Sequence, residues 1–100
     1  MKVRIKFRKY GVMRFIGHLD VMRYFQKVNR RAGVDIAYSG GFSPHQIMSF
    51  ASPLGLGLTS EGEYLDMEIL STDTSDHMVK RMNETMAEGM EIVSFLLLPE

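Results

Sequence analysis

The stretch Lys2-Val3-Arg4-Ile5-Lys6-Phe7-Arg8 decides the fold, because cationic and apolar residues alternate along it without exception. A period of two residues is the signature of a β-strand that buries one face. Val3, Ile5 and Phe7 are therefore expected to face a core, and the four cations are expected to point outward. The sheet that contains this strand should have one covered side and one open side.

Two later segments have the periodicity of amphipathic helices. The first helix is predicted over about residues 18–32, with Asp20 in its first turn and Gly33 at its end. The second is predicted over about residues 75–88, after a segment rich in capping residues and before Gly89. The apolar face of the first helix consists of Val21, Met22, Phe25, Val28 and Ala32.

Alternation and turn signals predict further strands at residues 34–38, 64–70 and 91–98, and a short one at 46–51. The order is β-α-β-β-β-α-β, or β-α-β-β-α-β if residues 46–51 are irregular or form only a hairpin arm. Split β-α-β units of this kind predict an α+β fold, a ferredoxin-like sandwich with an antiparallel sheet and two helices on one face. Residues 1–100 should form a single domain.

Composition excludes several classes of protein. With 100 residues and no cysteine, the chain is too short for a two-domain enzyme and has no thiolate for disulfides, metal sites or nucleophilic catalysis. The charged first residues do not resemble a signal peptide, and no apolar run approaches the roughly 20 residues of a membrane span. We therefore expect a cytoplasmic protein with no membrane partner.

The formal net charge of zero conceals an uneven distribution. Residues 1–50 hold ten Lys and Arg against two acidic residues, and residues 51–100 hold two against ten. Part of this charge should cancel across the open side of the sheet, where the cations of residues 2–8 are expected to face Asp66 and Glu68. A second set of cations lies on the first predicted helix, opposite its apolar face: Arg23, Lys27, Arg30 and Arg31. Two interpretations of this set stay open, a face that is solvated or touches an acidic segment, and a face that contacts phosphates.

Motifs for catalysis and metal binding are weak. His18, His45 and His77 lie in three separate segments without metal-ligand spacing, so no metal site is expected. The glycine-rich segment 52–62 matches neither a dinucleotide-binding nor a Walker motif. A loop that lies against a partner is the favoured interpretation of that segment.

The end of the chain is apolar on both faces of its predicted strand. A strand of this kind needs cover on both sides, and a short domain supplies it on one. We therefore predict an interface for a second copy or for a missing C-terminal half. Its residues are Phe95, Leu96, Leu97 and Leu98.

Five motifs, in order, carry a resemblance to a known family. They are Arg14-Phe15-Ile16-Gly17-His18-Leu19-Asp20, Arg30-Arg31-Ala32-Gly33, Ala37-Tyr38-Ser39-Gly40-Gly41-Phe42-Ser43-Pro44, Ser49-Phe50-Ala51-Ser52-Pro53-Leu54-Gly55 and Glu61-Gly62-Glu63-Tyr64-Leu65-Asp66. The sequence resembles the radical-SAM-linked protein family, bacterial domains of unknown function found beside radical SAM proteins or fused to their C-terminus. The chain departs from the family at Gly17, where Ser is more frequent, and in length, so that it resembles the N-terminal half of a family domain.

The resemblance implies a non-catalytic accessory domain that partners a radical SAM protein, in cis or in trans. It implies no cofactor in this chain, because an iron–sulfur cluster and S-adenosylmethionine would belong to the partner. Analogy with RNA-processing proteins of the same fold adds a role in presenting or binding structured RNA. Candidate residues taken from the motifs are His18, Asp20, Tyr38, Gly41, Phe42, Pro44, His45, Gly55, Glu63 and Tyr64, with Tyr64 expected on the open sheet face.

Two other functions stay open at this point. One is an RNA-processing or RNA-modifying enzyme with His18 or His45 as general acid–base. The other is a purely structural protein-interaction domain, which would bury the cations of the first helix in a contact.

Overall fold

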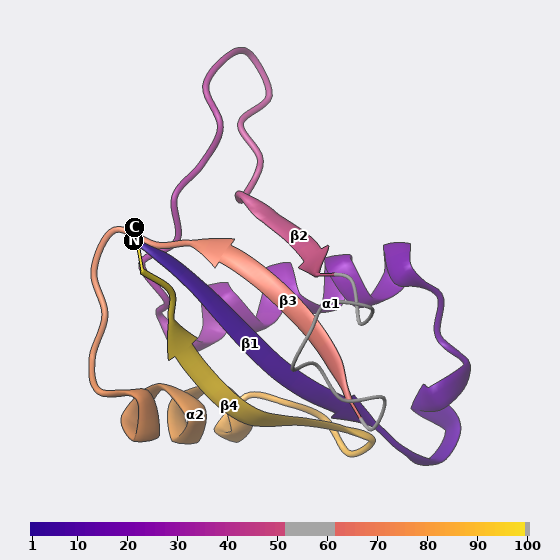
Figure 1. The fold of residues 1–100 in the computed structure, drawn as a ribbon. Coiled ribbons are helices and arrows are strands. Elements are labelled where there is room, and N and C mark those ends of the chain that lie inside the picture. Colours follow the sequence, from indigo (N-terminus) through magenta and orange to yellow (C-terminus); the bar gives the residue numbers. More distant parts are fainter. Residues whose placement is uncertain (52–61, 100) are drawn as a thin grey trace.

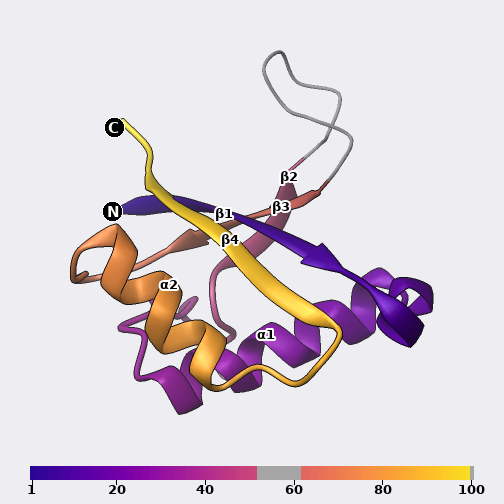
Figure 2. The same cartoon turned by 90° about the horizontal axis from the view of Figure 1, so that it is seen from below.

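Four strands and two helices form the framework of the part of the chain that the computed structural model describes, residues 1–51 and 62–99. They are β1 (Lys2–Lys9), α1 (His18–Ala32), β2 (Met48–Ala51), β3 (Glu63–Glu68), α2 (Ser75–Glu84) and β4 (Met90–Leu97), with a 3-10 helix, η1 (Gly11–Phe15), between β1 and α1. The strands are antiparallel in the order β2-β3-β1-β4. Both helices lie on one face of the sheet (Figures 1 and 2). The predicted α+β, ferredoxin-like sandwich is therefore confirmed.

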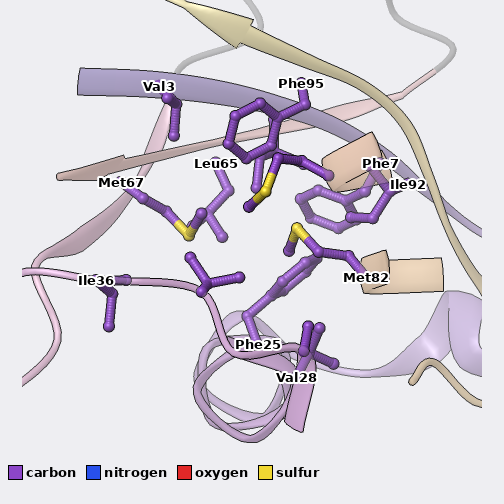
Figure 3. Packing of buried hydrophobic residues seen from close by; sticks show 14 of the residues in the cluster. Val3, Phe7, Phe25, Val28, Ile36, Leu65, Met67, Met82, Ile92 and Phe95 are labelled. Atoms are coloured by element: carbon purple, nitrogen blue, oxygen red, sulfur yellow. The ribbon is translucent and has the colours of Figure 1, made fainter. Parts of the chain in front are cut away.

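β1 is one of the two inner strands of the sheet, and its alternating sequence buries one of its faces. Ile5 pairs with Leu65 of β3 on one side and with Phe95 of β4 on the other. Val3, Ile5 and Phe7 are fully buried on the face that the helices cover, and the Phe7 ring meets Phe25 of α1 edge to face, with 4.8 Å between centroids. Figure 3 shows side chains from β1, β3, β4, α1 and α2 converging in this core.

α1 has the predicted bounds and is closed at its C-terminal end by two devices. Gly33 adopts a left-handed conformation with φ of 70°, which glycine tolerates without strain. The guanidinium of Arg81 on α2 donates hydrogen bonds to the carbonyl oxygens of Ala32 and Gly33, at 2.6 and 3.1 Å. Because the last carbonyls of a helix lack partners of their own, Arg81 fixes the end of α1 against α2.

The predicted strand at residues 34–38 is wrong. Two isolated bridges replace it, one from Ile36 to Ile69 and one from Tyr38 to Gln46. The reason is competition for one edge of β3, where Glu68 accepts a hydrogen bond from Ala37 N–H and donates its own N–H to the carbonyl of Ile47. Since β2 occupies that edge as far as Glu68, the observed order is β-α-β-β-α-β, but the segment that is not a strand is 34–38 and not, as the alternative assumed, 46–51.

α2 begins at Ser75 as predicted but ends at Glu84, one turn before residue 88. Thr85 closes it by donating its hydroxyl hydrogen to the carbonyl oxygen of Met82, at 2.8 Å. β3 and β4 differ from their predicted ranges, 64–70 and 91–98, by one or two residues at their ends. Gly55 and the rest of residues 52–61 lie outside the described residues.

The open face of the sheet bears the predicted charge pairing in part. Arg4 binds Asp66 through two hydrogen bonds, of 2.8 and 3.0 Å, and these bonds raise the pKa of the Arg4 guanidinium above its ordinary value. Glu68 binds the N-terminal ammonium of Met1, at 2.9 Å. Arg8 departs from the prediction, because it forms an ion pair with Glu91 of the neighbouring strand β4, at 3.4 Å, and not with a carboxylate of β3.

Tyr64 lies opposite Lys6 on the open face, as expected, and its ring centroid is 6.0 Å from the ammonium of Lys6. Neighbouring side chains leave little of Tyr64 exposed. Its expected place on the open face is therefore confirmed, although the residue is buried there.

The predicted apolar interface loses one member, because Phe95 is 3% exposed and belongs to the core. A β-bulge shifts the register of β4 between Lys6 and Phe7 of β1, so that Ile92 and Phe95 both face the helices. Leu96 and Leu97 are exposed, and Leu98 is half-buried. Docking of a second copy or a further half at this edge stays a prediction.

No helix within residues 1–51 and 62–99 combines the length and the apolar character needed to cross a membrane.

The Arg4–Asp66 pair gives a prediction about stability. The Asp66 side chain is 11% exposed, so Arg4→Met would leave a nearly buried carboxylate without its bidentate partner. We expect the free energy of unfolding in urea to fall by about 1–3 kcal/mol. Arg8→Met, at the exposed Arg8–Glu91 pair, is the control and should cost less than about 1 kcal/mol. Equal losses would contradict the assigned role of the Arg4–Asp66 pair.

The start of α2 gives a prediction about pH. The pKa of Asp73 is held below its ordinary value, first by the hydrogen bond that its carboxylate accepts from Thr74 N–H (2.8 Å) and also by His77, whose Nδ1 lies 2.6 Å from Oδ2. A carboxyl group with a lowered pKa stabilises the fold above its ordinary pKa, and the contribution disappears as pH falls through the lowered value. Asp73→Asn should therefore be less stable than the parent at neutral pH, and the difference should shrink in acid. A difference in the unfolding free energy that stays constant from about pH 6 to pH 2 would contradict this assignment.

Candidate nucleic-acid interface

The four cations predicted on α1 are all exposed. The opposite side of the helix is buried against the sheet through Val21, Phe25, Val28 and Ala32. At 100° per residue the cations span about 100° of the helix surface. This surface, the cationic stripe, is formed by Arg23, Lys27, Arg30 and Arg31.

Among the described residues, one member of the cationic stripe has a carboxylate within ion-pair distance. Arg23 lies 3.9 Å from Asp20, and both side chains are largely exposed, so the pair contributes little to stability. Within residues 1–51 and 62–99, no carboxylate is within ion-pair distance of Lys27, Arg30 or Arg31. Arg30 and Arg31 occupy the last turn of α1, where cations stabilise a helix through its dipole. Lys27 and Arg23 lie too far from the end for that explanation.

A hollow of about 240 Å³ lies beside the cationic stripe, between α1 and the end of α2. Tyr24, Lys27 and Arg31 line one side, and Glu84, Thr85, Met86 and Ala87 line the other. Tyr24 holds the two sides together, because its hydroxyl oxygen accepts a 2.6 Å hydrogen bond from Ala87 N–H. The hollow is smaller than the usual pocket for a small molecule, roughly 300–1,000 Å³, and suits contact with one group of a larger ligand.

The motif residues are spread over several parts of the molecule. His18, at the start of α1, stacks on Phe50 of β2 with 4.6 Å between ring centroids. Glu63 and Tyr64 lie on β3, while Asp20 lies in the first turn of α1. A further group belongs to an arm that projects from the sheet (Figure 1). The arm is the part of the chain between Tyr38 and Gln46, which are joined by an isolated β-bridge. This arm carries Tyr38, Gly41, Phe42, Pro44 and His45, all exposed.

The three histidines make separate contacts in the described part of the chain. His18 makes a ring contact with Phe50, and His45 is bound through its backbone N–H to the hydroxyl oxygen of Ser39 at 3.0 Å. His77 pairs with Asp73. No group of three or more His, Asp or Glu residues among those described could hold a metal ion.

Sequence reasoning missed a partly buried lysine next to the motif residues. Lys9 follows Val3, Ile5 and Phe7 at the same two-residue spacing, so the alternation already predicts that its side chain points inward. Its side chain is 11% exposed, and its ammonium lies 3.1 Å from Glu63 Oε1 and donates to the carbonyl oxygen of Ile16 at 3.4 Å. Lys9 therefore ties the end of η1 to β3.

A buried polar contact on α1 was also missed. Asn29 is fully buried, and its Nδ2 donates to Gln46 Oε1 at 3.0 Å, while Gln46 Nε2 donates to the carbonyl oxygen of Gln26 at 3.1 Å. The helical period places Asn29 four residues after Phe25, on the apolar face. The contact secures α1 to the segment that leads into β2.

The chain belongs to the family described as uncharacterized proteins conserved in bacteria (DUF2344), whose profile matches residues 2–100. No curated protein and no solved structure matches the chain. The expected membership of a bacterial family of unknown function is therefore confirmed.

Proposed function

We propose that this bacterial family member is a non-catalytic accessory domain that binds structured RNA through the cationic stripe and works beside a radical SAM protein. The proposal has two parts with separate support. The charge and exposure of α1 support the RNA contact. The five sequence motifs support the association with a radical SAM protein.

The observation that carries the RNA contact is the exposed cationic stripe, three of whose four members have no carboxylate within ion-pair distance among the described residues. α1 has 15 residues, so its exposed side is about 22 Å long. RNA helices are recognised mainly through phosphates and 2′-hydroxyls, and an exposed row of cations supplies donors for both. Arg in particular offers a planar set of donors that matches a phosphate.

The association with a radical SAM protein rests on the resemblance and on one property of the sequence. Iron–sulfur clusters are held by cysteine thiolates, and this chain contains no cysteine. Any cluster and its bound S-adenosylmethionine would therefore belong to the partner. The domain would supply binding and orientation, while the partner carries the chemistry.

The RNA contact predicts a salt dependence. If the cationic stripe makes four phosphate contacts, log K plotted against log salt should fall with a slope of about −2.8 for single-stranded RNA or about −3.6 for a duplex. Changing Arg23, Lys27, Arg30 or Arg31 singly to Ala should flatten the slope by just under one unit each. Titrations of a labelled hairpin RNA at several salt concentrations measure this.

Lys80→Ala is the matched control, because Lys80 is an exposed cation on α2, outside the cationic stripe. It should leave the slope unchanged. Binding that responds equally to Lys80→Ala and Lys27→Ala would indicate a diffuse effect of net charge. No binding at low salt would remove RNA from the proposed function.

The partner contact predicts a defined complex. The tagged chain, expressed in its native host and purified without oxygen, should retain a radical SAM protein that is identified by mass spectrometry and by iron–sulfur absorption. Treatment with ribonuclease should leave the complex intact if the contact is direct. Recovery of the chain without such a protein, under conditions that preserve iron–sulfur clusters, would contradict this part of the proposal.

A further inference from the structure

η1 and the start of α1 present large apolar side chains to solvent. Val12 is 83% exposed, Phe15 is 81% exposed and Leu19 is 65% exposed. In a 3-10 helix residues three apart lie on the same side, so Val12 and Phe15 project together. A single exposed apolar residue is ordinary, but three within eight residues indicate a contact surface.

Hydrogen bonds on both sides of η1 hold it in place. Tyr10 N–H donates to the carbonyl oxygen of Gly89 at 2.9 Å, and Lys9 holds the carbonyl of Ile16 on the far side of η1. Met13 packs against the core beside Gly89, where a Cβ atom would overlap its side chain. η1 therefore places Met13 inward, and its fixed ends leave Phe15 directed outward.

The surroundings of Phe15 are cationic. The guanidinium of Arg14 lies 5.4 Å from the centroid of the Phe15 ring, and Arg14 Nε donates to the carbonyl oxygen of Gly11 at 3.2 Å. This hydrogen bond fixes Arg14 beside the ring. Figure 2 shows the segment between β1 and α1 at one end of the molecule, directly before α1. Leu19 and then Arg23, the first member of the cationic stripe, follow on the exposed side of α1.

We propose that Phe15 is a stacking platform for an unpaired base of the RNA whose phosphates the cationic stripe holds. The inference rests on the proposed function and narrows its ligand to RNA with an unpaired nucleotide next to the phosphates bound by α1. Unpaired bases are typically bound by stacking on aromatic rings, with arginine planes as further partners. The fixed turn lowers the entropy lost on binding, because the ring is already held outward.

The cations favour a base over a purely apolar partner. An apolar partner would desolvate Arg14, and the buried charge would need a counter-charge that the partner would have to supply. A nucleotide carries both a flat apolar face and a phosphate. It therefore satisfies Phe15 and Arg14 together.

The test uses the whole chain and a hairpin RNA with 2-aminopurine at an unpaired loop position. The parent should quench the fluorescence of this base on binding. Phe15→Leu, which keeps an apolar side chain but removes the ring, should abolish the quenching and weaken binding by about 5- to 150-fold. Phe15→Tyr should restore both, and the salt slope should stay that of the parent in all variants.

Val12→Ala is the control, because it removes a neighbouring exposed apolar side chain without removing a ring. It should bind and quench as the parent does. Parent-like binding and quenching by Phe15→Leu would overturn the platform and leave the phosphate contacts intact. If Phe15→Leu and Val12→Ala weaken RNA binding equally and the parent also binds anionic vesicles, the platform is overturned in favour of contact with a lipid surface. Absence of salt-dependent binding by the parent would overturn the platform and the proposed function together.

Discussion

The burial of one face of β1 is the constraint on which the rest of the structure depends. Val3, Ile5 and Phe7 are fully buried, and the strand is paired on both edges, so β3, β4 and both helices must assemble around it. The same alternation forces its cations onto the opposite face, where they need counter-charges. Arg4 finds a nearly buried carboxylate in Asp66, and Arg8 finds Glu91.

This constraint explains how the uneven charge of the sequence is used. Cations of the first half that lie on β1 meet acidic residues of β3 and β4 from the second half, so the sheet neutralises much of the asymmetry within the fold. α1 lies in the other layer, and its cations are out of reach of those carboxylates. Among the described residues, α1 therefore carries a row of cations of which three have no carboxylate within ion-pair distance, and this row makes α1 the candidate interface.

The sequence predicted β1, α1 and the start of α2, where the periodicity is undisturbed, and it placed β2, β3 and β4 to within one or two residues at their ends. It failed where two segments compete or where one residue shifts a register. Residues 34–38 have strand character, but β2 already occupies most of the β3 edge that they would need. Phe95 was assigned to an interface because a β-bulge in β4 cannot be read from alternation alone. Lys9 and Asn29 were missed because polar residues at inward positions were not followed as part of the core.

α1, which carries the cationic stripe, is held at both ends, and this affects how the stripe would bind a ligand. His18 stacks on Phe50 at the start of α1, and Arg81 fixes the carbonyls at its end. A surface fixed in this way loses little conformational freedom when a ligand arrives, so its affinity is set by desolvation, charge and stacking. Long cationic side chains still pay an entropic cost for each phosphate contact, whereas an aromatic side chain has only two rotatable bonds to order. In the proposed complex, an anchored aromatic residue beside a row of cations would therefore have two separate contacts, with the cations binding phosphates and the ring stacking on an unpaired base.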